Sequence, residues 1–115
     1  MIRIDQLSVR LSGFSLKSVD LRVEQGEFFC LLGPTGAGKT LILESVAGVV
    51  AIADGRIRVA GREVSGLPPE RRGVGIVYQD CALFPHLSVA KNINFGIRYH
   101  NRSTPAGRAG CRDLI

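Results

Sequence analysis

The stretch GPTGAGKT, residues 33–40, has the residue types and the spacing G-x-x-x-x-G-K-[ST] of a phosphate-binding loop. Its glycines let backbone N–H groups approach an anion without an intervening Cβ, at the positive end of a following helix. Lys39 would reach the β and γ phosphates, and the hydroxyl of Thr40 would bind Mg²⁺. The candidate nucleotide-binding residues are Gly33, Pro34, Thr35, Gly36, Ala37, Gly38, Lys39 and Thr40.

The context of this loop distinguishes it from a chance match and from the other common nucleotide fingerprint. Four specified positions recur by chance on the order of once per few hundred chains of this size. Here the loop follows an expected strand and opens an expected helix, which is the context the chemistry requires. The dinucleotide fingerprint GxGxxG would use an acidic residue about 20 positions further on, and Asp54 lies near that distance. The Gly-Lys-Thr ending favours the phosphate-binding loop.

The elements that must hold this loop predict an α/β fold. The runs IRIDQLSV and FSLKSVDLRV nearly alternate apolar and polar residues, as half-buried strands do. The continuous apolar run at residues 28–32 predicts a strand buried on both faces, as in a parallel sheet. Residues 39–48 predict a helix, and Gly48 is expected to cap its C-terminus.

The part of the chain after this helix predicts further short elements. Residues 56–61 and 73–79 are expected to form strands, separated by a connector whose paired prolines exclude regular pairing. Residues 87–97 predict a helix with Ser88 as its N-cap. Residues 99–115 contain glycine, proline, serine and arginine without an apolar period, and we expect an irregular or disordered tail there.

The composition of the 115 residues fits one soluble globular domain or a piece of one, with 45% hydrophobic and 22% charged residues. No apolar run reaches the roughly 18 residues of a membrane span. The three cysteines, Cys30, Cys81 and Cys111, form no metal-ligand pattern, so we expect reduced thiols and no zinc site. The net charge of +5 comes partly from arginines near the C-terminus. These lack interleaved aromatics, so a solvated basic tail is expected in preference to a nucleic-acid surface.

Three stretches together resemble the ATP-binding subunits of ABC importers. They are VDLRVEQGEFFCLLGPTGAGKT, ILESVAGVVAIADGRIRVAGREV and PPERRGVGIVYQDCALFPHLSVAKNINFG. The resemblance covers residues 1–98 and is most similar to the molybdate/tungstate importer ATPases. It implies an incomplete ABC nucleotide-binding domain, in which a P-loop NTPase core carries an N-terminal antiparallel β-subdomain. ATP and Mg²⁺ are the implied cofactors.

The resemblance also implies roles for residues outside the loop. Gln79 matches the glutamine that contacts Mg²⁺ or the attacking water and links the nucleotide site to the membrane subunits; the alternative is a polar residue that caps a strand end. The segment 81–89 would lie against transmembrane permease subunits through Leu83, Phe84 and Leu87, which could instead pack on the domain's own core.

An aromatic residue of the first hairpin stacks on adenine in this family. Phe14 is the one aromatic residue in that part of the sequence, and a core phenylalanine is the alternative interpretation. His86 is interpreted as a loop residue, because the catalytic histidine of the family lies further downstream.

The sequence also lacks parts of the family pattern. No LSGGQ signature follows the loop, and no adjacent Asp-Glu pair or downstream switch histidine is present. The resemblance implies that the complete protein is a homodimeric ATPase, peripheral on the cytoplasmic side of the membrane, which couples ATP hydrolysis to transport. Our hypothesis for this chain is a truncated or frame-disrupted product or a fragment, and we expect weak Mg-ATP binding and negligible hydrolysis. A non-catalytic nucleotide-binding fragment and a P-loop NTPase unrelated to transport are the alternatives.

Overall fold

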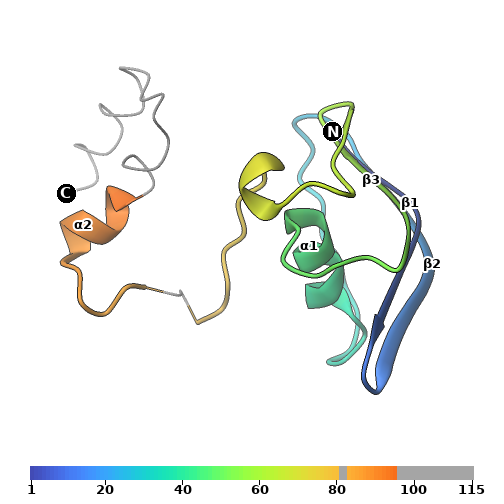
Figure 1. Ribbon diagram of the computed structural model, residues 1–115, viewed down its shortest axis with the longest axis horizontal. Coiled ribbons are helices and arrows are strands. Elements are labelled where there is room, and N and C mark those ends of the chain that lie inside the picture. Colours follow the sequence, from blue (N-terminus) through green and yellow to red (C-terminus); the bar gives the residue numbers. More distant parts are fainter. Residues whose placement is uncertain (81–82, 96–115) are drawn as a thin grey trace. The chain divides into compact units, whose positions relative to one another are not determined.

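The computed structural model describes residues 1–80 and 83–95, and the chain divides into two compact units, Met1–Ile76 and Val77–Ile115. The first unit contains a four-stranded sheet in the order β2-β1-β3-β4 (Figure 1). Its strands are β1 (Ile2–Leu11), β2 (Phe14–Val23), β3 (Asp54–Val59) and β4 (Arg62–Glu63). Each neighbouring pair is antiparallel, so the expected N-terminal antiparallel hairpin is confirmed.

The register of β1 is interrupted at Gln6, and this interruption decides which of its side chains are buried. The register shifts between Ile4 and Leu7, and again between Leu7 and Val9, in the pairing with β2, and between Asp5 and Ser8 in the pairing with β3. Gln6 has a φ of 52°, and its backbone N–H donates to Asp20 Oδ1 at 2.7 Å. Strict alternation would place residues three apart on opposite faces, and the extra residue of the bulge restores them to the same face. Both Ile4 and Leu7 are therefore buried.

Helix α1 (Lys39–Ala47) packs on one face of this sheet (Figure 1). Its apolar residues join those of β1 and β3 in one buried cluster. Burying each such side chain contributes on the order of 1.5–3 kcal/mol relative to leaving it in water. The cluster consists of Ile4, Leu7, Val9, Leu41, Ile42, Val46, Ile57 and Val64. The expected helix is confirmed, as is Gly48 at its C-cap, with a left-handed φ of 84°.

Two strand predictions are wrong. Residues 28–32 and 73–79 carry no strand in the structure, and Phe28 and Leu32 are 91% and 88% exposed. A strand is stable only when a neighbour accepts and donates its ladder hydrogen bonds. Within the described residues, the sheet consists of the four antiparallel strands, and these strands pair only with one another. Neither segment pairs with any of these strands, so its backbone lacks the ladder hydrogen bonds of a strand.

The strand expected at 56–61 is confirmed, with an earlier start. It forms as β3 from Asp54 to Val59 and turns through Ala60 and Gly61 into β4. The proline-containing connector is irregular as expected, apart from the short 3₁₀ helix η1 (Pro69–Arg71).

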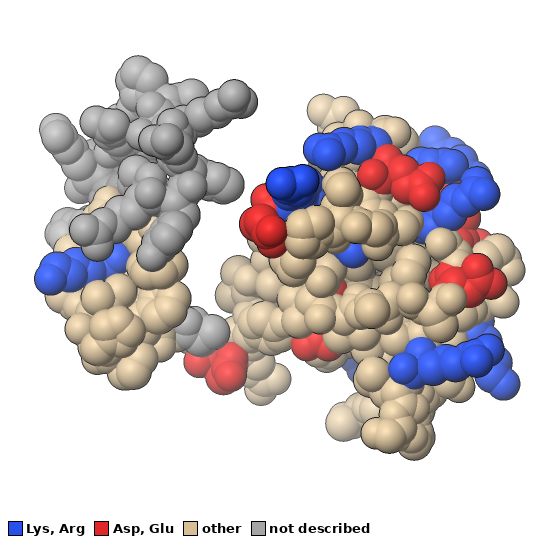
Figure 2. Space-filling view, in the orientation of Figure 1, with Lys and Arg blue, Asp and Glu red and all other residues tan. Residues whose placement is uncertain are grey.

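Ion pairs on the sheet lie at its surface. Arg3 Nε and Asp5 Oδ1 are 2.7 Å apart, Arg58 Nη1 and Asp5 Oδ2 are 3.3 Å apart, and Arg22 Nε and Glu24 Oε1 are 2.5 Å apart. Figure 2 shows acidic and basic side chains of this unit interspersed on the face in view. Exposed pairs of this kind contribute about 0–1 kcal/mol each, so they do not hold the sheet together.

The described part of the second unit contains helix α2 (Val89–Ile93). Ser88 is its N-cap as expected, because its hydroxyl accepts a hydrogen bond from the Lys91 N–H at 3.3 Å. The predicted helix, 87–97, includes two residues beyond 95. Those two residues, the predicted domain boundary at 98 and the predicted tail at 99–115 lie outside the described residues. Among the residues that are described, no helix is long and apolar enough to span a bilayer.

Candidate functional site

The loop at residues 33–40 leads into α1, as the sequence predicts, and its last two residues, Lys39 and Thr40, begin the helix. Gly36 and Gly38 have φ values of 82° and 87°, a region that residues with a Cβ rarely adopt. A Cβ at Gly36 would meet no atom within 4 Å, so the space beside the backbone is open at this position. The backbone of the loop therefore has the conformation and the free space that an anion needs.

The start of α1 leaves its amides available to a ligand. The N-cap is Gly38, which has no side chain to accept from the first N–H groups, and the first turn contains no acidic residue. The first amides of a helix have no partner within the helix. Together with the helix dipole, they make this end of α1 favourable for negative charge.

The ammonium group of Lys39 lies across this loop. It donates to the carbonyl oxygens of Gly33 at 2.7 Å and of Pro34 at 2.6 Å. A further bond from the Ala37 N–H to the Pro34 carbonyl, at 3.2 Å, closes the turn. The lysine thus links the start of α1 to the first residues of the loop, and its cation lies against the carbonyls of Gly33 and Pro34. Bonds from an ammonium to phosphate oxygens are shorter and stronger than those to neutral carbonyls.

Thr40 is exposed at the start of α1. Together with Lys39 it lines the edge of a cavity of about 690 Å³ whose other walls include Phe28, Phe29 and Leu43. This cavity is mainly apolar, so its chemistry differs from that of the amide-lined loop. Among the described residues, no group of three or more His, Cys, Asp or Glu side chains could hold a metal ion. The binding of Mg²⁺ by the Thr40 hydroxyl therefore stays a prediction.

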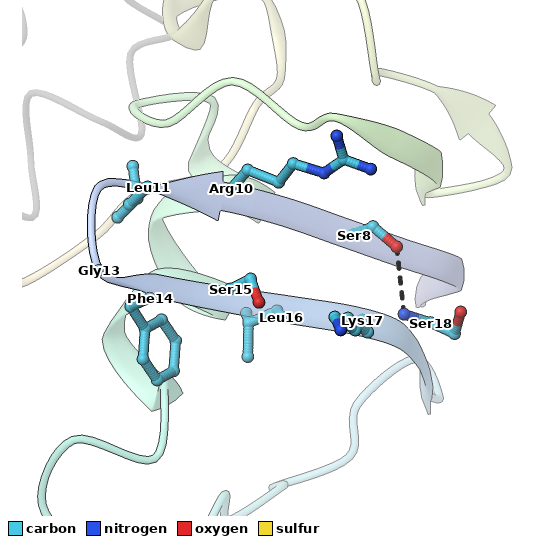
Figure 3. Close-up of a pocket in the computed structure, with 9 residues that line it drawn as sticks. All are labelled: Ser8, Arg10, Leu11, Gly13, Phe14, Ser15, Leu16, Lys17 and Ser18. Carbon is cyan, nitrogen blue, oxygen red and sulfur yellow. Dashed lines mark hydrogen bonds between the residues drawn. The ribbon is translucent and has the colours of Figure 1, made fainter.

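Phe14 lies beside the phosphate-binding loop. If Gly38 carried a Cβ, that atom would be 3.1 Å from two ring carbons of Phe14 and 2.7 Å from Leu16 Cδ2. Figure 3 shows both side chains on the same side of the hairpin. Sequence reasoning did not single out Leu16, although its position two residues after Phe14 on a strand places it on the same face.

A second pocket, of about 530 Å³, is formed by this hairpin (Figure 3). Arg10 and Lys17 contribute positive charge to it. Ser8 Oγ accepts from the Ser18 N–H at 3.1 Å and joins the two strands at its edge. The remaining lining residues are Leu11, Gly13, Phe14, Ser15 and Leu16.

Gln79 belongs to the second unit and the phosphate-binding loop to the first. Its contribution to Mg²⁺ binding therefore stays a prediction. Cys30 is exposed with a free thiol, and Cys81 and Cys111 lie outside the described residues.

The described part of the segment 81–89 presents apolar side chains to solvent. Leu83 is 69% exposed, and the ring of Phe84 packs against Phe95 with centroids 4.2 Å apart. Asn92 fixes the loop, because its Nδ2 donates to the Phe84 carbonyl at 3.1 Å and its Oδ1 accepts from the Phe84 N–H at 2.9 Å. The ring of His86 lies edge-on to Phe84 at 6.0 Å. This histidine is a loop residue, as the sequence suggests.

Comparison with known proteins gives a family match and a set of relatives. The family model described as "ABC transporter" matches residues 16–112. A molybdate/tungstate import ATP-binding protein of Archaeoglobus fulgidus is 54% identical over 77% of this chain and 36% of its own length. A spermidine/putrescine import ATP-binding protein of Thermobifida fusca is 44% identical over 85% of the chain and 25% of its own length. An Fe(3+) ions import ATP-binding protein of Streptomyces avermitilis is 37% identical over the whole chain and 34% of its own length.

A solved structure shares the fold. It is a dimeric ATP-binding cassette in a post-hydrolysis state, bound to ADP and Pi. It superimposes with a TM-score of 0.79 at 21% identity, over 97% of this chain and 53% of the solved chain. The chain spans about a quarter to a third of the length of the curated relatives described above.

Proposed function

Because the chain belongs to the ABC transporter family, we propose that its residues 33–40 bind the phosphates of Mg-ATP as part of the ATP-binding subunit of an importer. The observation that carries the proposal is the open glycine loop at the uncapped start of α1, with the Lys39 cation beside it.

Each group of the loop has a distinct role in this proposal. The amides of Gly36, Gly38, Lys39 and Thr40 donate to phosphate oxygens without any rearrangement of the helix. Lys39 exchanges its two carbonyl acceptors, Gly33 and Pro34, for oxygens of the β and γ phosphates. The hydroxyl of Thr40 holds Mg²⁺, which when bound neutralises part of the phosphate charge. Hydrogen bonds to charged groups contribute about 1.5–3 kcal/mol each, enough for micromolar-to-millimolar affinity from a few of them.

The proposed role of Lys39 is tested by calorimetric titration of Mg-ATP into the intact chain and its variants. Lys39→Ala is expected to weaken binding about 10- to 100-fold, because it removes at least one charge-assisted bond. Lys91→Ala, which removes the same charge from an exposed position in α2, is the control and should leave the affinity within about twofold. Equal affinity of the wild type and the Lys39 variant would refute the proposal.

We further propose that Phe14 stacks on the adenine ring. Its support is an exposed aromatic side chain next to Gly38, the last glycine before α1. Phe14→Leu is expected to weaken ATP binding about tenfold, since stacking of a base on an aromatic ring is worth about 1–3 kcal/mol. Inorganic triphosphate has no base, and its affinity should not change. Equal weakening of both ligands would show that Phe14 acts on the loop through Gly38 and not on adenine.

Hydrolysis by this chain is proposed to be negligible. Lys39, Thr40 and Gln79 provide positioning, but the sequence contains no adjacent Asp-Glu pair to hold Mg²⁺ and activate water. General-base catalysis alone commonly contributes 10²–10⁴-fold. Turnover of Mg-ATP that Lys39→Ala abolishes would contradict this part of the proposal.

The transported solute and the partners are proposed at two levels. The relatives described above are importer subunits for molybdate/tungstate, spermidine/putrescine and iron ions, so an importer is the coarse proposal and an oxyanion such as molybdate the finer one.

We propose that the complete protein is a homodimer on the cytoplasmic side of the membrane. The segment 81–89 would contact a permease subunit, supported by the exposure of Leu83. Co-purification of a permease, lost on Leu83→Glu but not on Lys91→Glu, would test this contact.

A further inference from the structure

Arg72 is a buried charged side chain that the phosphate chemistry does not use. It is only 7% exposed, and burial lowers its pKa because the charged form loses hydration. Within the described part of the chain, no carboxylate forms an ion pair with it. The acceptors that its guanidinium finds among these residues are backbone carbonyls. Nε donates to Leu67 at 2.7 Å, Nη2 to Ser65 at 3.0 Å, and Nη1 to Ser45 at 2.7 Å and Val46 at 3.4 Å.

Two of these carbonyls belong to the last turn of α1. The final C=O groups of a helix receive no hydrogen bond from an N–H group of the helix, and they form the negative end of its dipole. Helix α1 has no basic residue of its own in the last turn. The guanidinium of Arg72 therefore supplies a cation at this end of α1, from a position 26–27 residues further along the chain. It donates to Val46 and adds a second bond at Ser45, whose carbonyl also accepts from the Gly48 N–H at 3.3 Å.

Gly48 and Arg72 are fitted to each other at this end of the helix. A Cβ at Gly48 would lie 2.4 Å from Arg72 Nε and 2.8 Å from its Cζ. Gly48 also has a φ of 84°, which disfavours other residues. Two separate constraints therefore favour glycine at position 48. They are the left-handed conformation that ends α1 and the space that the guanidinium occupies.

We propose that Arg72 is a positioning residue for the phosphate-binding loop at the opposite end of α1; this inference rests on the proposed function. Helix α1 has nine residues, and a free helix of that length is marginal in water. Its N-terminus has no side-chain cap. The order of its first amides depends on packing and on the C-terminal carbonyls that Arg72 holds. Without those bonds the last turn frays, and the amides at Gly36–Thr40 are less well aimed at phosphate.

The test compares Arg72 with its neighbour Arg71, which is exposed. Mg-ATP affinity is measured by calorimetry on the full chain, at a temperature where circular dichroism shows each variant folded. Arg72→Met is expected to weaken binding about tenfold, and Arg72→Lys about threefold because an ammonium replaces part of the donor set. Arg71→Met removes the same charge and should change the affinity less than about twofold. An Arg72→Met affinity within twofold of the wild type would overturn the proposal.

Amide hydrogen exchange separates positioning from general stability. We expect Arg72→Met to increase exchange along α1 and leave β1 and β2 unchanged, whereas a purely structural residue would raise exchange in the sheet as well. Gly48→Ala should reproduce the effect by displacing the guanidinium. In the Arg72→Met background Gly48→Ala should have a smaller effect on exchange, because no guanidinium remains to be displaced.

The two proposals fail in different ways. If Arg72→Met does not fold, Arg72→Lys and Gly48→Ala decide the question by the same readouts. A wild-type chain that binds no Mg-ATP would refute the proposed function and the positioning role together. An intact wild-type affinity with uniform exchange across α1 and β1 in the variants would refute the positioning role alone.

Discussion

Strand β1 and the segment 28–32 are both rich in large apolar residues, but they meet opposite environments. Leu7 of β1 is fully buried, while Phe28 is 91% exposed. The difference lies in their neighbours. Strand β1 has β2 on one side and β3 on the other, and α1 covers the face that carries Leu7. Apolar content alone therefore does not bury a segment, because a strand also needs partners for its backbone groups.

The comparison predicts its largest effect for matched truncations in the two segments. Leu7→Ala should lower the free energy of unfolding by about 2–5 kcal/mol, since it leaves a cavity in the core cluster. Phe28→Ala removes a larger side chain but should change stability by less than about 0.5 kcal/mol. Urea unfolding followed by circular dichroism measures both. Similar losses for the two variants would show that Phe28 is buried in solution and would break the comparison.

A smaller effect is expected at the point where β3 meets the bulge of β1. Gly55 has a φ of 100°, and a Cβ there would lie 2.5 Å from the Gln6 carbonyl oxygen. Gly13 also has a positive φ of 85°, but a Cβ there would meet nothing within 4 Å. Gly55→Ala should therefore destabilise the sheet by about 1–3 kcal/mol. Gly13→Ala should destabilise it less, because only the positive φ disfavours alanine there. Equal losses in urea unfolding would mean that the close approach of β1 and β3 is not a constraint.

The smallest effect on stability is expected for polar replacements in the exposed segment. The double variant Phe28→Ser and Leu32→Ser should change the free energy of unfolding by less than about 0.5 kcal/mol. It should nevertheless reduce binding of a hydrophobic dye and self-association in sedimentation, because it removes exposed apolar surface. Marked destabilisation with unchanged dye binding would contradict the exposure of this segment.

The features that the sequence predicted correctly depend on residues close to one another in the chain. The β1–β2 hairpin follows from alternation, Gly48 ends α1 because it adopts a left-handed conformation, and Ser88 caps α2 with its hydroxyl. The glycine loop before α1 is likewise a local pattern, so its place in the structure could be predicted.

The features that could not be predicted depend on distant partners. The strands expected at 28–32 and 73–79 require neighbours that no local pattern provides. The bonds of Arg72 join residues 26–27 positions apart, and nothing in the sequence around it distinguishes it from Arg71. The contact of Leu16 with the loop arises in the same way, from the packing of a hairpin against a glycine.

The central claim is that the amides at the start of α1 receive phosphate. The most direct test is a titration of the ¹⁵N-labelled chain with Mg-ATP, followed by amide chemical shifts. We predict the largest changes at Gly36, Gly38, Lys39 and Thr40, with smaller changes near Phe14. Changes confined to other parts of the chain, or none at millimolar Mg-ATP, would contradict the claim.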